Sequence, residues 1–343
     1  MEYGAIDLHS KESEIRIVTA DGQVVLHRRI ATRRDLLCAV FEARPRLRIL
    51  LESGTESEWV ARSLESWGHE VIVADPNYAP MYAHRGRGIK TDRRDVMALV
   101  EANRRGLYRD AHRVSAAHRT MRRHLQVRDQ LVRMRTQIIN VMRAQIRSEG
   151  LRIRSGRAES FVTRYQALAV PAALQAVLEP LVRGLAALEP LIAAADGWAQ
   201  QTAQGDAVAR RLMTAPGVGP ITALSFQSAL DTVTRFHSPG AVSAYLGVVP
   251  HEDSSGERQR RGSITKAGPS PLRAVLVQAS WGVWRSPRRS ATLHAWVHRL
   301  ADRRGKRIAI VALARRLTRI LFAMWRDGRD FQPARVSRRG VAA

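Results

Sequence analysis

Cysteine is almost absent from the 343-residue sequence, in which Cys38 is the single example. One cysteine excludes an intrachain disulfide framework and a cysteine-based zinc site, and it fits a reducing compartment. The opening MEYGAIDLHS lacks the basic and apolar segments of a secretion signal, and no uncharged apolar run approaches the ~18 residues of a membrane helix. We therefore expect a cytoplasmic protein with no membrane partner.

Acidic residues are also scarce, and so is lysine. The chain has 31 Asp and Glu against 56 Lys and Arg, a net charge of +25, and only four of the basic residues are lysine. Residues 101–160 carry a net charge of +10 and residues 256–343 carry +17, whereas residues 1–100 are neutral. Clustered positive charge favours a polyanionic partner over plain solvated surface. We expect nucleic acid, either DNA or RNA, and hence a nucleoid-associated protein.

The first hundred residues alternate between strand and helix patterns. The expected strands cover residues 3–8, 14–19, 23–27, 47–51 and 70–74, and the expected helices cover 35–43 and 56–67. Asp21-Gly22 between two period-two segments is typical of a hairpin turn. Three antiparallel strands followed by helix–strand–helix–strand predict an α/β domain with a mixed sheet flanked by helices.

Residues 112–150 contain no Gly or Pro before Gly150 and predict one long helix. One apolar stripe (Leu131, Met134, Ile138, Val141) has heptad-like spacing, and a second (Leu125, Val132, Ile139, Ile146) repeats every seven residues. A coiled-coil arm is the favoured interpretation, and a helix buried in a bundle is the alternative. Four arginines around the stripes are candidate nucleic-acid contacts: Arg122, Arg123, Arg128 and Arg135.

Three further patterns follow the long helix. Residues 167–199 are rich in Ala and Leu but contain Pro171, Pro180 and Pro190, which predicts several short helices. Ala215-Pro-Gly-Val-Gly-Pro220 is a turn into a helix, where Gly217 and Gly219 either expose backbone N–H groups to a phosphate or simply make a tight turn. Residues 306–325 predict an amphipathic helix.

These changes along the chain predict a mainly α-helical second half and four segments. The segments are a mixed-sheet domain at 1–105, a helical or coiled-coil region at 106–205, a C-terminal domain at 206–330 and a mobile basic tail at 331–343.

Four carboxylates have positions from which they can converge. Asp7 and Glu52 end predicted strands, and Asp92 and Asp95 lie three residues apart on one helical face. Hard oxygen donors at one edge of a sheet suit Mg²⁺, and paired ions can stabilise the attacking and leaving oxygens of a phosphodiester. Asp75 also ends a strand and competes for the fourth position.

These residues resemble a known family. Asp7 in AIDLHS, Glu52 in LLESG, and Asp92 with Asp95 in KTDRRD resemble the DEDD set of the RuvC-like, ribonuclease-H-fold domain in the IS-one-ten family of insertion-sequence transposases. APGVGPITA, YLGVVP, Ser255-Gly256, GSITKAG and Leu272-Arg273 are similar to the family's C-terminal transposase domain in order and spacing. The resemblance covers residues 3–100 and 207–285. Val96 and Pro269 depart from the family's usual Ala and Asn.

The resemblance implies a Mg²⁺-dependent DNA transposase or recombinase. It further implies a structured guide RNA (a bridge RNA), a homo-oligomer (dimer or tetramer) and a catalytic serine at Ser255, with Ser254 as the alternative. We hypothesise that the serine attacks a DNA phosphate beside the carboxylate-bound metal, in a composite site of two domains. Candidate phosphate or backbone contacts follow it along the chain: Arg258, Arg260, Arg261, Lys266 and Arg273.

Two other functions are compatible with the same residues. A structure-selective nuclease, such as a Holliday-junction resolvase, would use the carboxylates with water as the nucleophile and form no covalent intermediate. A non-catalytic nucleic-acid-binding protein would lack Mg²⁺-dependent cleavage, although the four carboxylates argue against it.

Overall fold

The computed structural model describes residues 1–82, 91–252 and 261–333, and the chain forms two compact units, Met1–Val114 and Ser115–Ala343. The predicted boundaries at residues 105 and 205 stay predictions. Of the tail predicted to be mobile, residues 334–343 lie outside the described residues.

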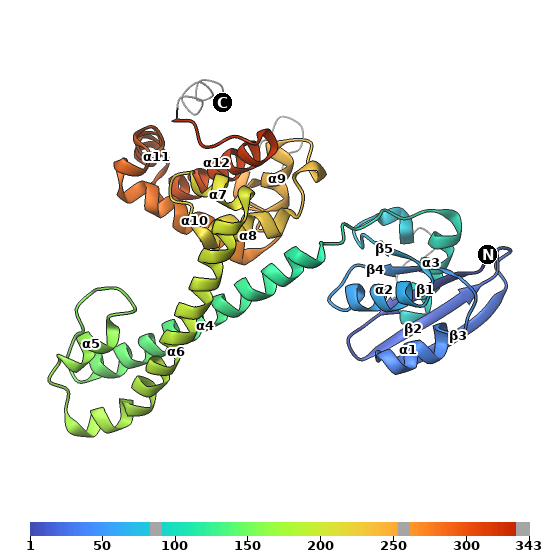
Figure 1. Cartoon of the computed structure of the whole chain (residues 1–343), viewed down its shortest axis with the longest axis horizontal. Coiled ribbons are helices and arrows are strands. Elements are labelled where there is room, and N and C mark those ends of the chain that lie inside the picture. Colours follow the sequence, from blue (N-terminus) through green and yellow to red (C-terminus); the bar gives the residue numbers. More distant parts are fainter. Residues whose placement is uncertain (83–90, 253–260, 334–343) are drawn as a thin grey trace. The chain divides into compact units, whose positions relative to one another are not determined.

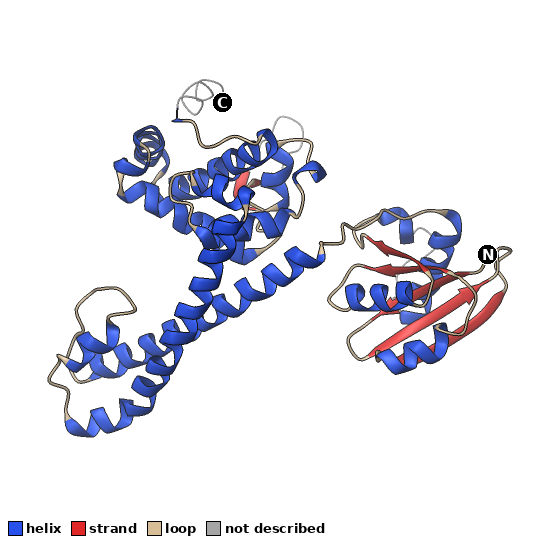
Figure 2. Ribbon diagram, in the orientation of Figure 1, coloured by secondary structure: helices blue, strands red, loops and turns tan. Residues whose placement is uncertain are grey.

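The N-terminal unit contains a five-stranded mixed sheet with helices on both faces (Figure 1, Figure 2). Its strands are β1 (Tyr3–Leu8), β2 (Glu12–Val18), β3 (Val24–Ala31), β4 (Arg48–Glu52) and β5 (Glu70–Ala74). The order across the sheet is β3-β2-β1-β4-β5, with antiparallel β1–β2–β3 and parallel β1–β4–β5. The α/β mixed sheet predicted from the sequence is confirmed.

Alternating side chains divide this unit into two apolar layers. Its helical segments are α1 (Arg34–Phe41), α2 (Ser57–Ser66), the short η1 (Ala79–Tyr82) and α3 (Asp92–Arg105). Ile6 and Leu51 belong to the layer that α1 and α2 cover, whereas Ala5 and Leu50 belong to the layer that α3 covers. Because successive strand residues point to opposite faces, Asp7 and Glu52 lie on the α3 face of the sheet.

Helix α3 is fixed at both ends. Thr91 precedes it, and its side-chain oxygen accepts a hydrogen bond from the Arg94 backbone N–H, so the helix begins at Asp92. Further along, the Asn103 side-chain amide donates to the carbonyl oxygens of Gly4 in β1 and Arg48 in β4, each at 2.8 Å. These bonds hold α3 across β1 and β4 and set the position of its first turn.

The C-terminal unit is mainly helical, as predicted. Its helices are α4 (Ala116–Ser148), α5 (Phe161–Gln166), α6 (Ala172–Gly205), α7 (Ala207–Met213), α8 (Pro220–Leu230), α9 (Pro239–Tyr245), α10 (Ser270–Arg285), α11 (Ala291–Arg304) and α12 (Lys306–Asp327). Two short strands, β6 (Pro250–Glu252) and β7 (Arg261–Ile264), pair antiparallel. Across the three described ranges, no helix has both the length and the apolar character needed to cross a bilayer.

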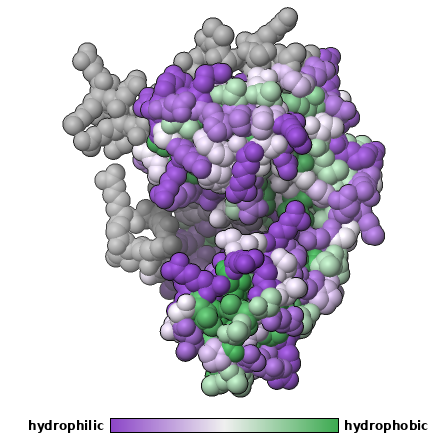
Figure 3. Space-filling model, turned by 90° about the vertical axis from the view of Figure 1, so that its left-hand side faces the viewer, coloured by the Kyte–Doolittle hydropathy of each residue, from purple (hydrophilic) through white to green (hydrophobic). Residues whose placement is uncertain are grey.

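Helices α4 and α6 pack against each other along an arm whose end carries α5 (Figure 1). Ile139 and Ile146 of the seven-residue repeat are buried in the core of the arm, whereas Met134 and Val141 of the other stripe are 41% and 48% exposed. The arm favoured from the sequence therefore describes α4 better than a helix buried on all sides. In Figure 3 a hydrophobic area lies at the bottom, at the height where Figure 1 draws the end of the arm.

Helix α6 corrects one prediction. Residues 172–205 form one continuous helix that contains Pro180 and Pro190, and not the several short helices that the prolines predicted. Both prolines are on the exposed side of α6, where a helix bends most easily, while Leu178, Leu185 and Leu188 are buried. A mid-helix proline costs about 3 kcal/mol, whereas burial of each large apolar side chain returns roughly 2 kcal/mol. Packing outweighs the penalty of the two prolines because five such side chains of α6 are buried: Leu174, Leu178, Leu185, Leu188 and Ile192.

Candidate active site

The carboxyl ends of two neighbouring strands place two acidic side chains side by side. β1 and β4 are parallel partners, with Ile6 opposite Leu51, so Asp7 and Glu52 come next in register on the α3 face. Asp7 is buried, at 7% exposed, and Glu52 is half-buried. The Tyr82 hydroxyl of η1 donates a hydrogen bond to Glu52 Oε1. The sheet thus delivers both carboxylates to one edge.

The first turn of α3 adds Asp92 and Asp95 to the same place. Asp95 is 6% exposed, and the Asp92 side chain is 44% exposed. Negative charge in a first helical turn is favoured by the helix dipole, which offsets part of the cost of gathering carboxylates. The four predicted carboxylates therefore lie together around Asp7, although they come from three separate stretches of the chain.

The crowding of carboxylates affects the pKa of Asp7. The pKa of Asp7 is raised from its ordinary 3.8 to about 6, chiefly by burial and in part by the charges of Asp95, Glu52 and Asp92, while His9 acts in the opposite direction. Oδ2 of Asp7 is buried and makes no hydrogen bond to any residue in the described ranges. A buried carboxylate in this state is stabilised by an added positive charge.

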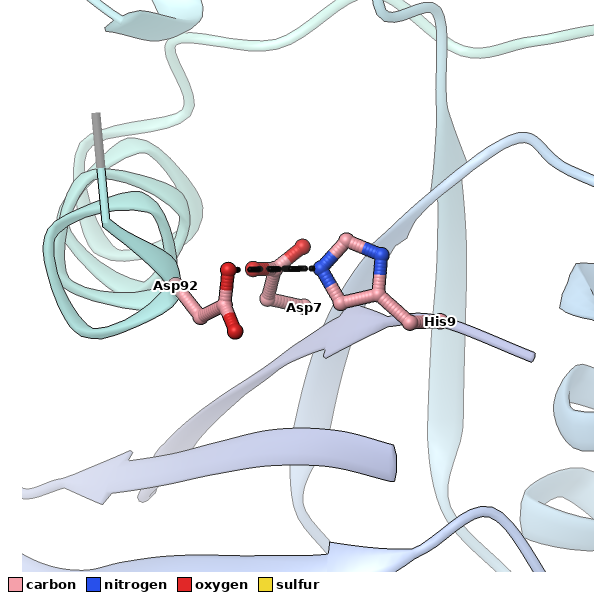
Figure 4. A group of neighbouring side chains, drawn as sticks. All are labelled: Asp7, His9 and Asp92. Atoms are coloured by element: carbon pink, nitrogen blue, oxygen red, sulfur yellow. Dashed lines mark ion pairs between the residues drawn. The ribbon is translucent and has the colours of Figure 1, made fainter. Parts of the chain in front are cut away.

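His9 approaches two of these carboxylates and was missed by the sequence reasoning. Its Nε2 lies 3.4 Å from Asp7 Oδ2 and 3.6 Å from Asp92 Oδ1, and Figure 4 shows the ring nitrogen directed at both. The available signal was spacing, because a residue two positions after Asp7 lies on the same side of an extended chain.

Two other charged residues near the strand ends have different roles. Asp75, the competing fourth ligand, accepts hydrogen bonds from Arg109 Nη2 at 2.5 Å and from the Asn77 backbone N–H at 2.9 Å. These bonds, of which the one from Asn77 has the larger effect, lower the pKa of Asp75. Arg29 of β3 lies 3.7 Å from Asp92 and supplies a cation at the exposed rim.

The donor set fits a divalent metal ion. Ligand atoms of Asp7, His9 and Asp92 all lie within 4.8 Å of one another, and Glu52 and Asp95 adjoin Asp7. Carboxylate oxygens are the donors that Mg²⁺ prefers, and the buried Asp7 Oδ2, which makes no hydrogen bond within the described residues, is an acceptor for such an ion.

The four predicted arm arginines lie in different surroundings. Arg122 donates to the carbonyl oxygens of Ser228 and Ala229 at the end of α8, at 2.7 and 3.1 Å. Arg135 is buried and pairs with Glu159 and Glu189 at 3.2 and 3.3 Å. Arg128 pairs with Asp196 at 2.6 Å, while Arg123 is exposed. Arg123 is thus the member of this set with the most accessible side chain.

The glycine turn before α8 has a packing role. Gly217 has φ +79°, and a Cβ there would stand 2.4 Å from the carbonyl oxygen of Ala279 in α10. Gly219 is the N-cap of α8, and a Cβ there would meet nothing within 4 Å. Close approach of α10 therefore accounts for Gly217, while the phosphate contact predicted for this turn stays a prediction.

The last predicted contacts lie beside β7. Lys266 is exposed, whereas Arg273 Nη1 donates to the carbonyl oxygens of Ala267 and Gly268 at 2.6 and 2.9 Å and stabilises the loop before α10. Ser254, Ser255, Arg258 and Arg260 lie outside the described residues, and so does the side chain of Arg261.

Two family profiles match the chain. The one described as "Transposase IS116/IS110/IS902 family" matches residues 209–295, and a profile for DEDD transposases of the IS110 type, described as "Transposase", matches residues 5–149. The second match contains all four carboxylates, and the first contains the glycine turn and the predicted serine.

Similar proteins cover nearly the whole chain. A Pseudomonas aeruginosa protein named "Probable family 20 transposase" is 30% identical over 309 residues, 87% of this chain and 90% of that protein. The transposase for insertion sequence element IS1111A of Coxiella burnetii is 26% identical over 88% of this chain and 84% of its own length. The transposase for insertion sequence element IS1328 of Yersinia enterocolitica is 27% identical over 95% and 97%.

Proposed function

Because the chain belongs to the IS116/IS110/IS902 family of transposases, enzymes that catalyse DNA strand transfer, we propose that it cuts and joins DNA with a divalent metal ion and a serine nucleophile. The metal ligands in this proposal are Asp7, Glu52, Asp92 and Asp95, the ion is Mg²⁺, and the nucleophile is Ser255. The observation that carries the proposal is the convergence of these carboxylates around the buried Asp7.

Each carboxylate has a distinct task in this proposal. Asp7 and Asp95, which are buried, hold the ion in a fixed place against the sheet, and the more exposed Asp92 faces the incoming DNA. Tyr82 fixes the orientation of Glu52. When bound, the ion supplies Lewis-acid stabilisation of charge on phosphate oxygens.

The serine step exchanges one phosphate ester for another. The Ser255 Oγ–H bond breaks, a new Oγ–phosphorus bond forms, and the DNA oxygen that leaves takes up a proton as a free hydroxyl. The energy of the phosphodiester is kept in the phosphoserine link, so rejoining to another strand needs no external energy source. Lys266 and the arginines at 258, 260 and 261 are proposed to hold the phosphate.

The metal part of the proposal is tested by Asp92→Asn with Asp35→Asn as its matched control. Both side chains are solvent-accessible, 44% exposed for Asp92 and 59% for Asp35, so both variants should fold, and Asp35 in the first turn of α1 pairs with Arg33. We expect Asp92→Asn to lose cleavage of element-end DNA in Mg²⁺ by about 100-fold or more and the control to keep it. Equal activity of the two variants would contradict metal binding at this cluster.

The serine part is tested by trapping the covalent protein–DNA adduct on denaturing gels. We expect Ser255→Ala to abolish the adduct and Ser254→Ala to retain it. Loss of the adduct only in Ser254→Ala would move the nucleophile by one residue. Cleavage by the unaltered protein without any adduct would instead support a resolvase-like reaction with water as the nucleophile.

We further propose that a structured guide RNA selects the DNA, that the protein acts as a dimer or tetramer, and that it works on the nucleoid. The net charge of +17 over residues 256–343 supports binding of nucleic acid in general. Purified complex should contain RNA transcribed from the element's flank, and ribonuclease treatment should abolish site choice. Unchanged site choice after complete RNA removal would contradict a guide, and light scattering of the complex measures the oligomer.

A further inference from the structure

His9 is placed as a ligand would be, on the side of the sheet that carries the proposed metal site. It follows β1 directly, two residues after Asp7, and its Nε2 is 3.4 Å from Asp7 Oδ2 and 3.6 Å from Asp92 Oδ1. Neighbouring ligands of an octahedral ion lie roughly 3 Å apart when each bond is about 2.1 Å. Both distances from His9 are therefore slightly longer than in a closed coordination shell, and ligand atoms of the three residues, which all lie within 4.8 Å of one another, can contract around one cation.

A second observation points to a ligand at the same place. The Asp7 side chain is only 10% exposed, and its Oδ2, the oxygen that faces His9, makes no hydrogen bond within the described part of the chain. His9 Nε2 lies 3.4 Å from this oxygen, which is too long for a strong hydrogen bond and leaves the buried oxygen poorly satisfied. A cation bound by Asp7 Oδ2, Asp92 Oδ1 and His9 Nε2 would satisfy all three atoms together.

We propose that His9 binds the divalent cation through Nε2, which makes the centre a mixed nitrogen–oxygen site. The proposal rests on the proposed function, because it adds a ligand to the same carboxylate centre. An imidazole donor raises affinity for transition metals more than for Mg²⁺, because nitrogen is a softer donor than carboxylate oxygen. The centre therefore accepts Mn²⁺ as readily as Mg²⁺ or better.

The test uses Mn²⁺ bound to the full-length protein and pulsed electron paramagnetic resonance. A nitrogen atom bonded to Mn²⁺ modulates the electron spin echo at nitrogen frequencies, which carboxylate and water ligands do not produce. We expect nitrogen modulation in the unaltered protein and its loss in His9→Gln. Because the His9 side chain is 56% exposed, this substitution leaves the core intact.

His27→Gln is the matched control. His27 is another histidine of the N-terminal unit that lies against a carboxylate, with Nε2 2.6 Å from Glu14 Oε1. The control should keep the nitrogen modulation. In calorimetric titrations His9→Gln should lose about tenfold in affinity for Mn²⁺ and a smaller factor for Mg²⁺, while His27→Gln changes neither.

The possible outcomes separate this inference from the proposed function. Bound Mn²⁺ without nitrogen modulation, or modulation that persists in His9→Gln, overturns the role of His9 and leaves the carboxylate centre standing. If the unaltered protein binds no Mn²⁺ and no Mg²⁺, the metal centre itself fails and His9 with it. Modulation that disappears only in His9→Gln supports the mixed site.

Discussion

The two units of the chain differ in how they use charge. Residues 1–114 hold 19 basic and 17 acidic residues, and the acidic ones include a cluster around a buried aspartate. Residues 115–343 hold 37 basic and 14 acidic residues, many of the former exposed on long helices. A near-neutral unit can gather carboxylates for chemistry, while a unit with a net charge of +23 attracts the polyanion. The difference predicts that the metal centre lies in the N-terminal unit, whereas most of the affinity for nucleic acid comes from the C-terminal unit.

The largest effect that we expect from this division between the two units is that of Asp7→Asn. It removes a buried ligand from the carboxylate cluster, so we expect DNA cleavage to fall on the order of 1,000-fold. DNA affinity should change by less than about twofold, because the positive surface of the C-terminal unit is untouched. Cleavage assays and gel-shift titrations measure the two quantities. A parallel loss of both would show that the N-terminal unit also dominates binding.

Gly217→Ala should destabilise the C-terminal unit and leave the N-terminal unit unaffected. The new Cβ would stand 2.4 Å from the Ala279 carbonyl oxygen in a φ +79° conformation, so we expect about 3 kcal/mol or more of destabilisation. Gly219→Ala, with open space at its Cβ, should cost about 1 kcal/mol or less. Hydrogen exchange of the full chain measures both, and protection of β1 and β4 should stay unchanged. Equal costs at the two glycines would contradict the packing account.

The stability of the metal-free N-terminal unit should depend on pH because of the buried carboxyl group of Asp7. The folded pKa of Asp7 is about 6 against an ordinary 3.8, so folding favours its protonated form. Stability from this group is present below pH 3.8 and is lost as the pH rises through about 6, by roughly 3 kcal/mol in all. Asp7→Asn should remove that loss. Hydrogen exchange of the β1 and β4 amides measures this stability across the pH range. The same pH dependence in the unaltered protein and in Asp7→Asn would contradict the raised pKa of Asp7.

Two neighbouring arginines give the smallest effects and separate packing from binding. Arg122→Ala removes bonds to the Ser228 and Ala229 carbonyl oxygens and should cost about 2 kcal/mol of stability. Arg123→Ala should leave stability within about 0.5 kcal/mol and lower the salt dependence of nucleic-acid binding by about one phosphate contact. Thermal unfolding and gel shifts at several salt concentrations measure the pair. Reversed results would place the packing role on Arg123.

Local sequence rules predicted the sheet and most of the candidate site. Short apolar segments predicted β1 and β4, and the expectation that carboxylates at strand ends converge at one edge of a sheet brought Asp7 to Glu52. The three-residue spacing of Asp92 and Asp95 predicted one helix face, and the structure has both in the first turn of α3. The strands and this helix could be predicted because each follows from residues that are close together along the chain, whereas the pairing of β1 with β4 joins distant segments.

Other features depend on tertiary partners that spacing does not reveal. The continuity of α6 through Pro180 and Pro190 rests on its packing against α4. The internal bonds of Arg122 require the distant end of α8. His9 could have been found from its position two residues after Asp7, but its proximity to Asp92 required the placement of α3. The role of Ser255 stays a prediction that trapping can decide.

The most direct test is the stability of the N-terminal unit, measured by hydrogen exchange of β1 and β4 amides at pH 7.5 with and without Mg²⁺. Without Mg²⁺ we expect Asp7→Asn to be more stable than the unaltered protein, because the substitution removes a crowded buried charge. Mg²⁺ should then stabilise the unaltered protein and leave the variant unchanged. A variant that is less stable without Mg²⁺, or that gains as much from Mg²⁺ as the unaltered protein, would contradict a divalent-cation centre built on these carboxylates.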